Sequence, residues 1–121
     1  MDAGRKQETF WRGIDCFNRR KFFECHEVLE EIWLQEPETE KPFYQGLIQV
    51  AAGFHQLLEK KNPRGAASLL RRGMKKLEPY PPHSHGLDLA ALLAQLAPWL
   101  DRLAHGQPTD DLPLPRIHPA V

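Results

Sequence analysis

The sequence predicts an all-α protein, a compact bundle of about five helices. Apolar residues recur at helical spacing in five segments, and no segment of useful length alternates in the manner of a strand. Proline and glycine separate these segments at positions that suit helix boundaries. The chain has 121 residues, which is typical of one domain and enough to bury a core without disulfide or metal support.

The predicted helix boundaries follow from local signals. Pro42 suits the first turn of the third helix, and Asn62 followed by Pro63 is a typical N-cap and first helical residue of the fourth. Pro98 lies inside the fifth helix and is expected to kink or split it. The helices are predicted over about residues 5–19, 22–35, 42–60 and 63–77, and from near residue 87 through residue 103.

Two segments contain too much proline to be helical. Residues 78–86, "EPYPPHSHG", are expected to lie extended over the surface, because proline removes backbone donors and fixes φ. Residues 107–121 contain four prolines and are predicted to form an irregular tail. The expected organisation is therefore a single helical domain over residues 1–106 followed by this tail.

The composition limits the classes of partner and the compartment. Sixteen basic residues balance sixteen acidic ones, so no overall positive field favours nucleic acid as a partner. The basic side of the fourth helix is interpreted as a solvated face. No apolar run approaches the roughly 20 residues of a membrane span, and the first ten residues lack the apolar region of a signal peptide. Cys16 and Cys25 have no CxxC spacing, which favours reduced thiols in a cytoplasmic protein.

The second helix carries the first candidate site, in the stretch "FFECHEVLEEIWLQE". On a helical wheel three of its glutamates, at positions 24, 27 and 31, share one solvated side. His26 and Glu30 fall elsewhere, beside Trp33 and among large apolar residues, and their i, i+4 spacing brings them within reach of each other. The wheel therefore predicts a buried imidazole–carboxylate pair at a helix–helix seam.

The third helix supplies the residues expected near that pair. It has no charged residue between Lys41 and Glu59, and its polar positions are mostly glutamines. Gly46 and Gly53 lie seven residues apart, which indicates that another backbone approaches closely. In an antiparallel hairpin with the second helix, Trp33 lies level with Tyr44. The candidate functional residues are therefore His26, Glu30, Trp33, Tyr44, Gln45 and Gln49.

Several stretches resemble the bacterial and archaeal domain-of-unknown-function family 309. These are "FNRRKFFECHEVLEEIW", "FYQGLIQVAAGFHQL", "NPRGAASLLRRGMKKLEPYPP" and "GLDL". The resemblance implies a small all-helical domain and a hallmark HxxxExxW motif, here His26, Glu30 and Trp33. That motif has been suggested to bind a metal, and no biochemical activity is established for the family. Family members often carry a second histidine where this chain has Gln56.

Two functions remain open from the sequence. The first is an interaction or structural module that uses a groove between helices, with a protein or a second copy of the chain as partner and His26–Glu30 as a buried polar pair. The second is a metal-binding protein or metal-assisted hydrolase, with His26 and Glu30 holding zinc, iron or manganese and His55 or Gln49 completing the site. The first is favoured, because the sequence offers few ligands for a metal centre.

Overall fold

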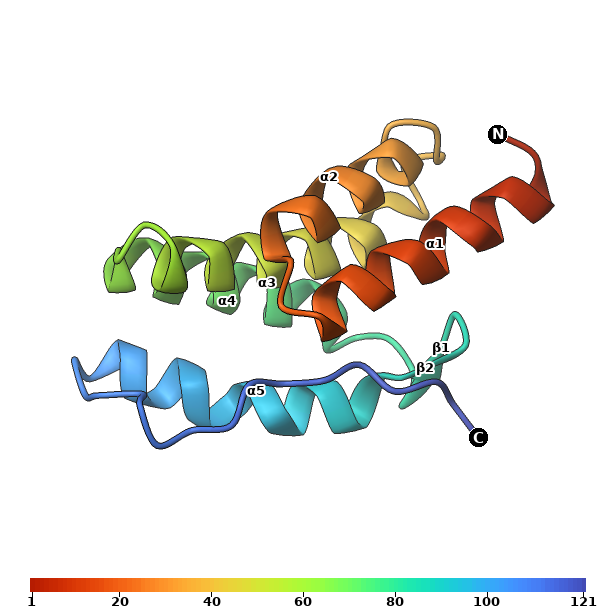
Figure 1. Cartoon of the computed structure of the whole chain (residues 1–121). Helices are drawn as coiled ribbons and strands as arrows, with labels where there is room; N and C mark the ends of the chain where they lie inside the picture. The colour runs from red at the N-terminus through yellow and green to blue at the C-terminus, as the bar shows by residue number, and fades with distance from the viewer.

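The computed structural model describes all 121 residues and confirms the all-α prediction (Figure 1). A short β-hairpin between the last two helices is its only regular sheet. No helix of this chain combines the length and apolar content that crossing a bilayer requires. The elements are α1 (Ala3–Asn18), α2 (Phe22–Trp33), α3 (Lys41–Leu58), α4 (Pro63–Leu77), β1 (His83–Ser84), β2 (Leu87–Asp88) and α5 (Leu89–Ala104).

Helix α3 is the central helix, as its apolar sequence predicts. It packs along both α2 and α4, and α1 packs on α2 (Figure 1). The close approach expected at the two glycines is confirmed, and the neighbouring backbone is that of α4. A Cβ atom added at Gly46 would lie 3.1 Å from the carbonyl oxygen of Gly73, and one at Gly53 would lie 3.4 Å from that of Ala66.

An aromatic cluster joins four helices at the centre of the core. Phe22 of α2 lies between Phe17 of α1 and Phe54 of α3, with ring centroids 5.2 Å apart in both pairs. Phe54 in turn meets Trp99 of α5 edge to face, at 5.1 Å. Such pairs add to the free energy gained from burying the rings. The cluster therefore links α5 to the three-helix layer that carries the candidate site.

Helix α5 is a single continuous helix, so of the two outcomes expected for Pro98, a kink or a split, the split is wrong. Pro98 and Ala94, the residue whose carbonyl loses its partner, are both exposed, so water can hydrate that carbonyl. The helix begins at Leu89 rather than near residue 87, because Leu87 and Asp88 pair in the hairpin. At the start of α4 the predicted N-cap is present, with Asn62 Oδ1 accepting from the Gly65 N–H at 3.0 Å.

The segment predicted as an extended surface loop contains the β-hairpin. Ser84 pairs with Leu87 and His83 with Asp88, and His85 and Gly86 form the two-residue turn between them. Both turn residues have positive φ, 54° and 78°, as a type I′ turn requires. Glycine adopts this conformation freely and histidine does so at a cost, so His85 is held there by its surroundings.

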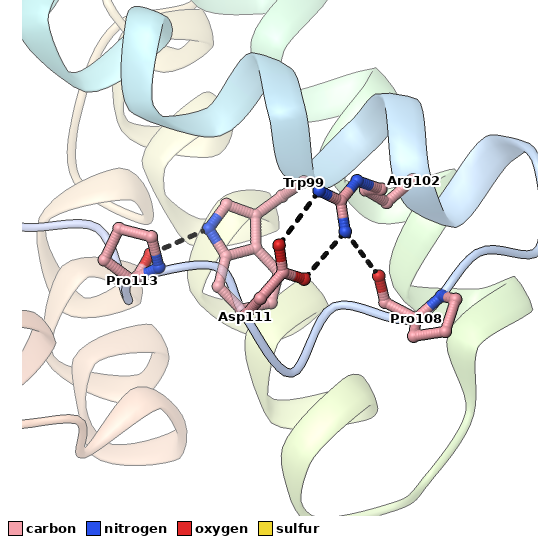
Figure 2. A network of polar contacts seen from close by, with 5 residues as sticks. All are labelled: Trp99, Arg102, Pro108, Asp111 and Pro113. Atoms are coloured by element: carbon pink, nitrogen blue, oxygen red, sulfur yellow. Dashed lines mark hydrogen bonds and ion pairs between the residues drawn. The ribbon is translucent and has the colours of Figure 1, made fainter.

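Residues 107–121, here called the tail, run back along α5 beneath the end of α1 (Figure 1). The tail contains no helix, and its Pro119 forms an isolated bridge with Leu87. Figure 2 shows how its first half is held, with the Trp99 indole N–H donating to the Pro113 carbonyl at 3.0 Å and Arg102 pairing with Asp111 at 2.8 Å. The tail is thus packed against the rest of the chain through specific contacts.

Candidate functional site

His26 and Glu30 form the predicted pair on successive turns of α2. His26 Nε2 lies 3.2 Å from Glu30 Oε2. The side chains are 32% and 44% exposed, so the expectation of a buried pair is wrong. The α2–α3 seam covers only one flank of these side chains and leaves the other open. The pair therefore lies at a surface where a ligand can reach it.

Glu30 faces a hollow of about 230 Å³ at the α2–α3 seam. Trp33 lines the same hollow from α2, and Gln45, Ile48 and Gln49 line it from α3. Four of the six predicted site residues therefore meet around one space, and His26 joins them through its contact with Glu30. We call this hollow and the His26–Glu30 pair the α2–α3 groove.

The indole N–H of Trp33 has no hydrogen-bond acceptor. Its Nε1 atom is buried and unpaired, the only such side-chain nitrogen or oxygen in the chain. Lys41 Nζ lies over the ring face, 4.6 Å from the centroid, and holds the indole in place by a cation–π contact. A buried unpaired donor costs about 1–3 kcal/mol. Because Trp33 lines the hollow while its Nε1 atom is covered, an incoming acceptor could satisfy this donor only once the indole turns toward the groove.

Gln49 has a partner that the sequence analysis missed. Its Oε1 atom on α3 accepts a hydrogen bond from Lys76 Nζ on α4, at 2.9 Å. The basic side of α4 is thus not entirely solvated, because one of its lysines reaches back to the α3 glutamine. The i, i+3 and i+4 spacings within each helix carry no signal for this contact, since it depends on how α4 crosses α3.

His55 does not complete a metal site with His26 and Glu30. It shares a separate hollow of about 320 Å³ with His26, and Phe23 lies there with them. The Phe23 ring centroid lies 5.2 Å from that of His55 and 6.1 Å from that of His26. No group of three or more histidine, cysteine, aspartate or glutamate side chains in the chain is placed to hold a metal ion.

Tyr44 belongs to a different site from the other candidates. It is 3% exposed and points away from the α2–α3 groove, toward a pocket of about 250 Å³ that α1, α3 and the hairpin tip share. Lys6 and His85 line this pocket with it. Burial raises the pKa of the Tyr44 hydroxyl, against the opposing effect of the Lys6 charge.

Ionisable groups around this second pocket form a network. A hydrogen bond to Glu36 raises the pKa of Lys6. The His85 ring stacks on Phe43, with centroids 3.7 Å apart and planes at 12°. Burial lowers the pKa of His85, and Glu40, 3.7 Å away, opposes that shift. The sequence analysis placed His85 only in an extended surface segment, and missed this network because it depends on the fold of the hairpin.

A known family model matches the part of the chain that contains the α2–α3 groove. Residues 10–69 match the model of the family described as Domain of unknown function (DUF309). The resemblance predicted from the sequence is therefore confirmed over these residues. The DUF309 match begins within α1, contains α2 and α3 entirely and ends within α4. Helix α5 and the tail lie outside it.

Two curated relatives share this sequence over different lengths. An uncharacterized protein from Aquifex aeolicus (strain VF5) is 30% identical over 111 residues, which is 91% of this chain and 33% of that protein. The uncharacterized protein YpuF from Bacillus subtilis (strain 168) is 35% identical over 60 residues, 49% of this chain and 34% of that protein. The chain thus spans about a third of the length of these relatives.

Proposed function

We propose that the chain is a protein-interaction module whose α2–α3 groove binds a basic, extended segment of a partner protein. The observation that carries this proposal is the unpaired Trp33 N–H beside the half-exposed Glu30. Once the indole turns toward the groove, a backbone carbonyl of the partner would accept from it, and a lysine or arginine side chain would pair with the carboxylate. The amides of Gln45 and Gln49 line the same space and can bond further peptide groups.

The charge around the groove supports a basic partner. Residues 24–40 contain seven glutamates and no lysine or arginine, whereas residues 60–76 contain seven basic residues and no acidic one. The zero net charge of the chain therefore hides an acidic side at α2 and a basic side at α4. Glu30 is the one carboxylate in the lining of the hollow, and Lys41 and Lys76 reach its edges, so the attraction for a cationic segment comes from the α2 glutamates as a group.

The lengths of the relatives and the free cysteines support a cytoplasmic module that works beside other domains. Because the chain spans about a third of the two relatives, most of each relative lies outside the matched region, which suits a module that works beside other domains. Cys16 and Cys25 are both free thiols, which suits the reducing cytoplasm. The proposed site of action is therefore cytoplasmic.

The alternative function, a metal-binding protein or metal-assisted hydrolase, has no comparable support in the geometry of the site. A catalytic metal site normally needs three protein ligands. His26 and Glu30 provide two, and the third expected ligand, His55, shares with His26 and Phe23 a hollow that Glu30 does not line. The half-exposed pair is better suited to exchange its internal contact for a contact with a partner.

Binding of a fluorescein-labelled oligolysine peptide, followed by fluorescence anisotropy, tests the proposal. We expect Glu30→Gln to weaken binding roughly three- to fivefold, as loss of one exposed ion pair of about 1 kcal/mol predicts. Glu27→Gln is the matched control, because it removes the same charge from an exposed position of the same helix. Equal losses of affinity in the two variants would show that the peptide responds only to the overall acidic charge. That result would contradict binding in the α2–α3 groove.

A further inference from the structure

The tail is held by two side-chain amides that each form a reciprocal pair of hydrogen bonds with one tail residue. Asn18 of α1 donates to the Ile117 carbonyl at 2.9 Å and accepts from the Ile117 N–H at 2.8 Å. Gln95 of α5 does the same with Arg116, at 2.9 Å for both bonds. Adjacent tail residues are therefore bound on opposite sides, as in an extended strand between two neighbours.

Further contacts extend this main-chain recognition along the tail. The Asp88 N–H donates to the His118 carbonyl and the Ala120 N–H to the Gly86 carbonyl, both at 2.8 Å. On the α5 side, the Trp99 indole N–H donates to the Pro113 carbonyl (Figure 2). Domains that bind proline-rich segments commonly do so in grooves lined by aromatic side chains.

Apolar side chains fix the register of the tail. Ile117 is 2% exposed and belongs to the main core. Pro115 is also buried, and Leu112 and Leu114 pack partly buried against the same core. Helices α1 and α5 make little direct contact with each other, so the tail fills the space between them. The surfaces of α1, α5 and the hairpin that hold it are here called the tail groove.

We propose that the tail groove is a receptor for a proline-rich extended segment, which the chain's own tail occupies in cis and the tail of a second copy occupies in trans. The tail of a second copy carries the sequence that already fits the groove. Exchange requires the tail to leave the tail groove and the turn after α5 to open, where Gly106 has φ 65° and open space around it. That turn is held by exposed contacts of Arg102 with Asp111 and the Pro108 carbonyl (Figure 2).

A fluorescein-labelled peptide of residues 107–121, added to the full chain, tests the receptor. In the wild-type chain the peptide competes with a tethered tail at an effective concentration in the millimolar range. Ile117→Ser in the chain weakens the cis tail and leaves the groove intact, so the peptide should bind at least about tenfold more tightly to this variant. Adding Asn18→Ala to Ile117→Ser should abolish that gain.

Arg116→Pro provides a second variant if Ile117→Ser does not fold. It removes the N–H that donates to Gln95 and takes no apolar side chain from the core. Circular dichroism confirms folding of each variant before binding is measured. Two results would contradict the proposal that the tail groove binds the peptide. The first is an affinity that does not increase in either folded variant, and the second is a gain in affinity that persists when Asn18→Ala is added.

Sedimentation equilibrium tests whether a second copy is the partner. The wild-type chain should form a dimer whose fraction increases with concentration, because exchange between copies is bimolecular. Asp111→Asn, which loosens the turn without touching the tail groove, should raise the dimer fraction. Peptide binding by a chain that stays monomeric at every concentration would contradict exchange between copies.

Discussion

A Cβ atom added at Gly73 of α4 would lie 2.7 Å from the carbonyl oxygen of Gly46 in α3. These two glycines are therefore where the backbones of the central helix and its main neighbour come closest. The obstacle is a backbone atom, which cannot rotate away as a flexible side chain can. The separation of α3 and α4 in turn positions Lys76 against Gln49 at the edge of the α2–α3 groove.

Gly73→Ala should destabilise the protein by about 1–3 kcal/mol, the usual cost of overpacking. Alanine is preferred to glycine inside a helix by about 1 kcal/mol, so a loss of stability would show that the close approach outweighs helix propensity. Urea denaturation gives the free energy of unfolding. Gly4→Ala is the control: its added Cβ meets only Asp2 Oδ1, at 3.5 Å, and it should be neutral or stabilising.

Asn18→Ala should destabilise the protein by about 1–3 kcal/mol, because it leaves the N–H and carbonyl of Ile117 without partners. Hydrogen exchange of the Ile117 amide should accelerate more than that of amides in α3. Gln107→Ala alters an exposed tail residue whose side chain makes no hydrogen bond, and should change neither quantity. Unchanged exchange at Ile117 in Asn18→Ala would show that the tail is held by its apolar anchors alone.

Much of the fold was predictable because its signals are local. The spacing of Phe10, Ile14 and Phe17 in α1 and the Asn62 cap of α4 depend on residues a few positions apart. The same holds for the His26–Glu30 pair and for the glycines of α3, whose absent side chains mark a close neighbour. The exposure of that pair was not predictable, because the helical wheel does not show how much of α2 its neighbours leave uncovered.

The parts that the sequence analysis missed depend on long-range placement. His85 meets Phe43 because a type I′ turn folds the hairpin tip onto α3. Ile117 meets Asn18 across 99 positions of sequence. A proline-rich segment has no periodic pattern that shows which of its residues are buried. Tyr44 was grouped with the α2–α3 candidates for a related reason, since its level along the hairpin was predicted but its direction was not.

Stability should fall as the pH is lowered through about 6.5, in part because of His85. Burial lowers the pKa of His85 below its ordinary value of 6.5 in the folded protein, although Glu40 and Glu36 act in the opposite direction and Lys6 in the same one. The unfolded chain therefore binds more protons than the folded protein below that pH, and stability decreases as the pH falls.

Thermal unfolding between pH 7.5 and about pH 5 measures this effect. His85→Gln should flatten the dependence of Tm on pH. His83→Gln removes an exposed imidazole from the same hairpin and should preserve the dependence. A wild-type slope retained in His85→Gln would assign the dependence to other groups.

Trp33→Phe should separate stability from binding. It removes the buried N–H that lacks an acceptor, so the free energy of unfolding should stay the same or increase despite the smaller ring. Affinity for the oligolysine peptide should nevertheless decrease, because the peptide carbonyl loses its donor. Large losses of both would indicate that Trp33 acts mainly through packing.

The resonance of the Trp33 indole N–H tests the central claim most directly. During titration of the ¹⁵N-labelled chain with oligolysine, this resonance should shift progressively as it gains an acceptor, together with backbone amides of residues 26–33 and 45–49. The indoles of Trp11 and Trp99 are internal controls, because they already donate to Gln7 and to the Pro113 carbonyl. Shifts confined to amides near exposed glutamates, with all three indole resonances unmoved, would contradict binding in the α2–α3 groove.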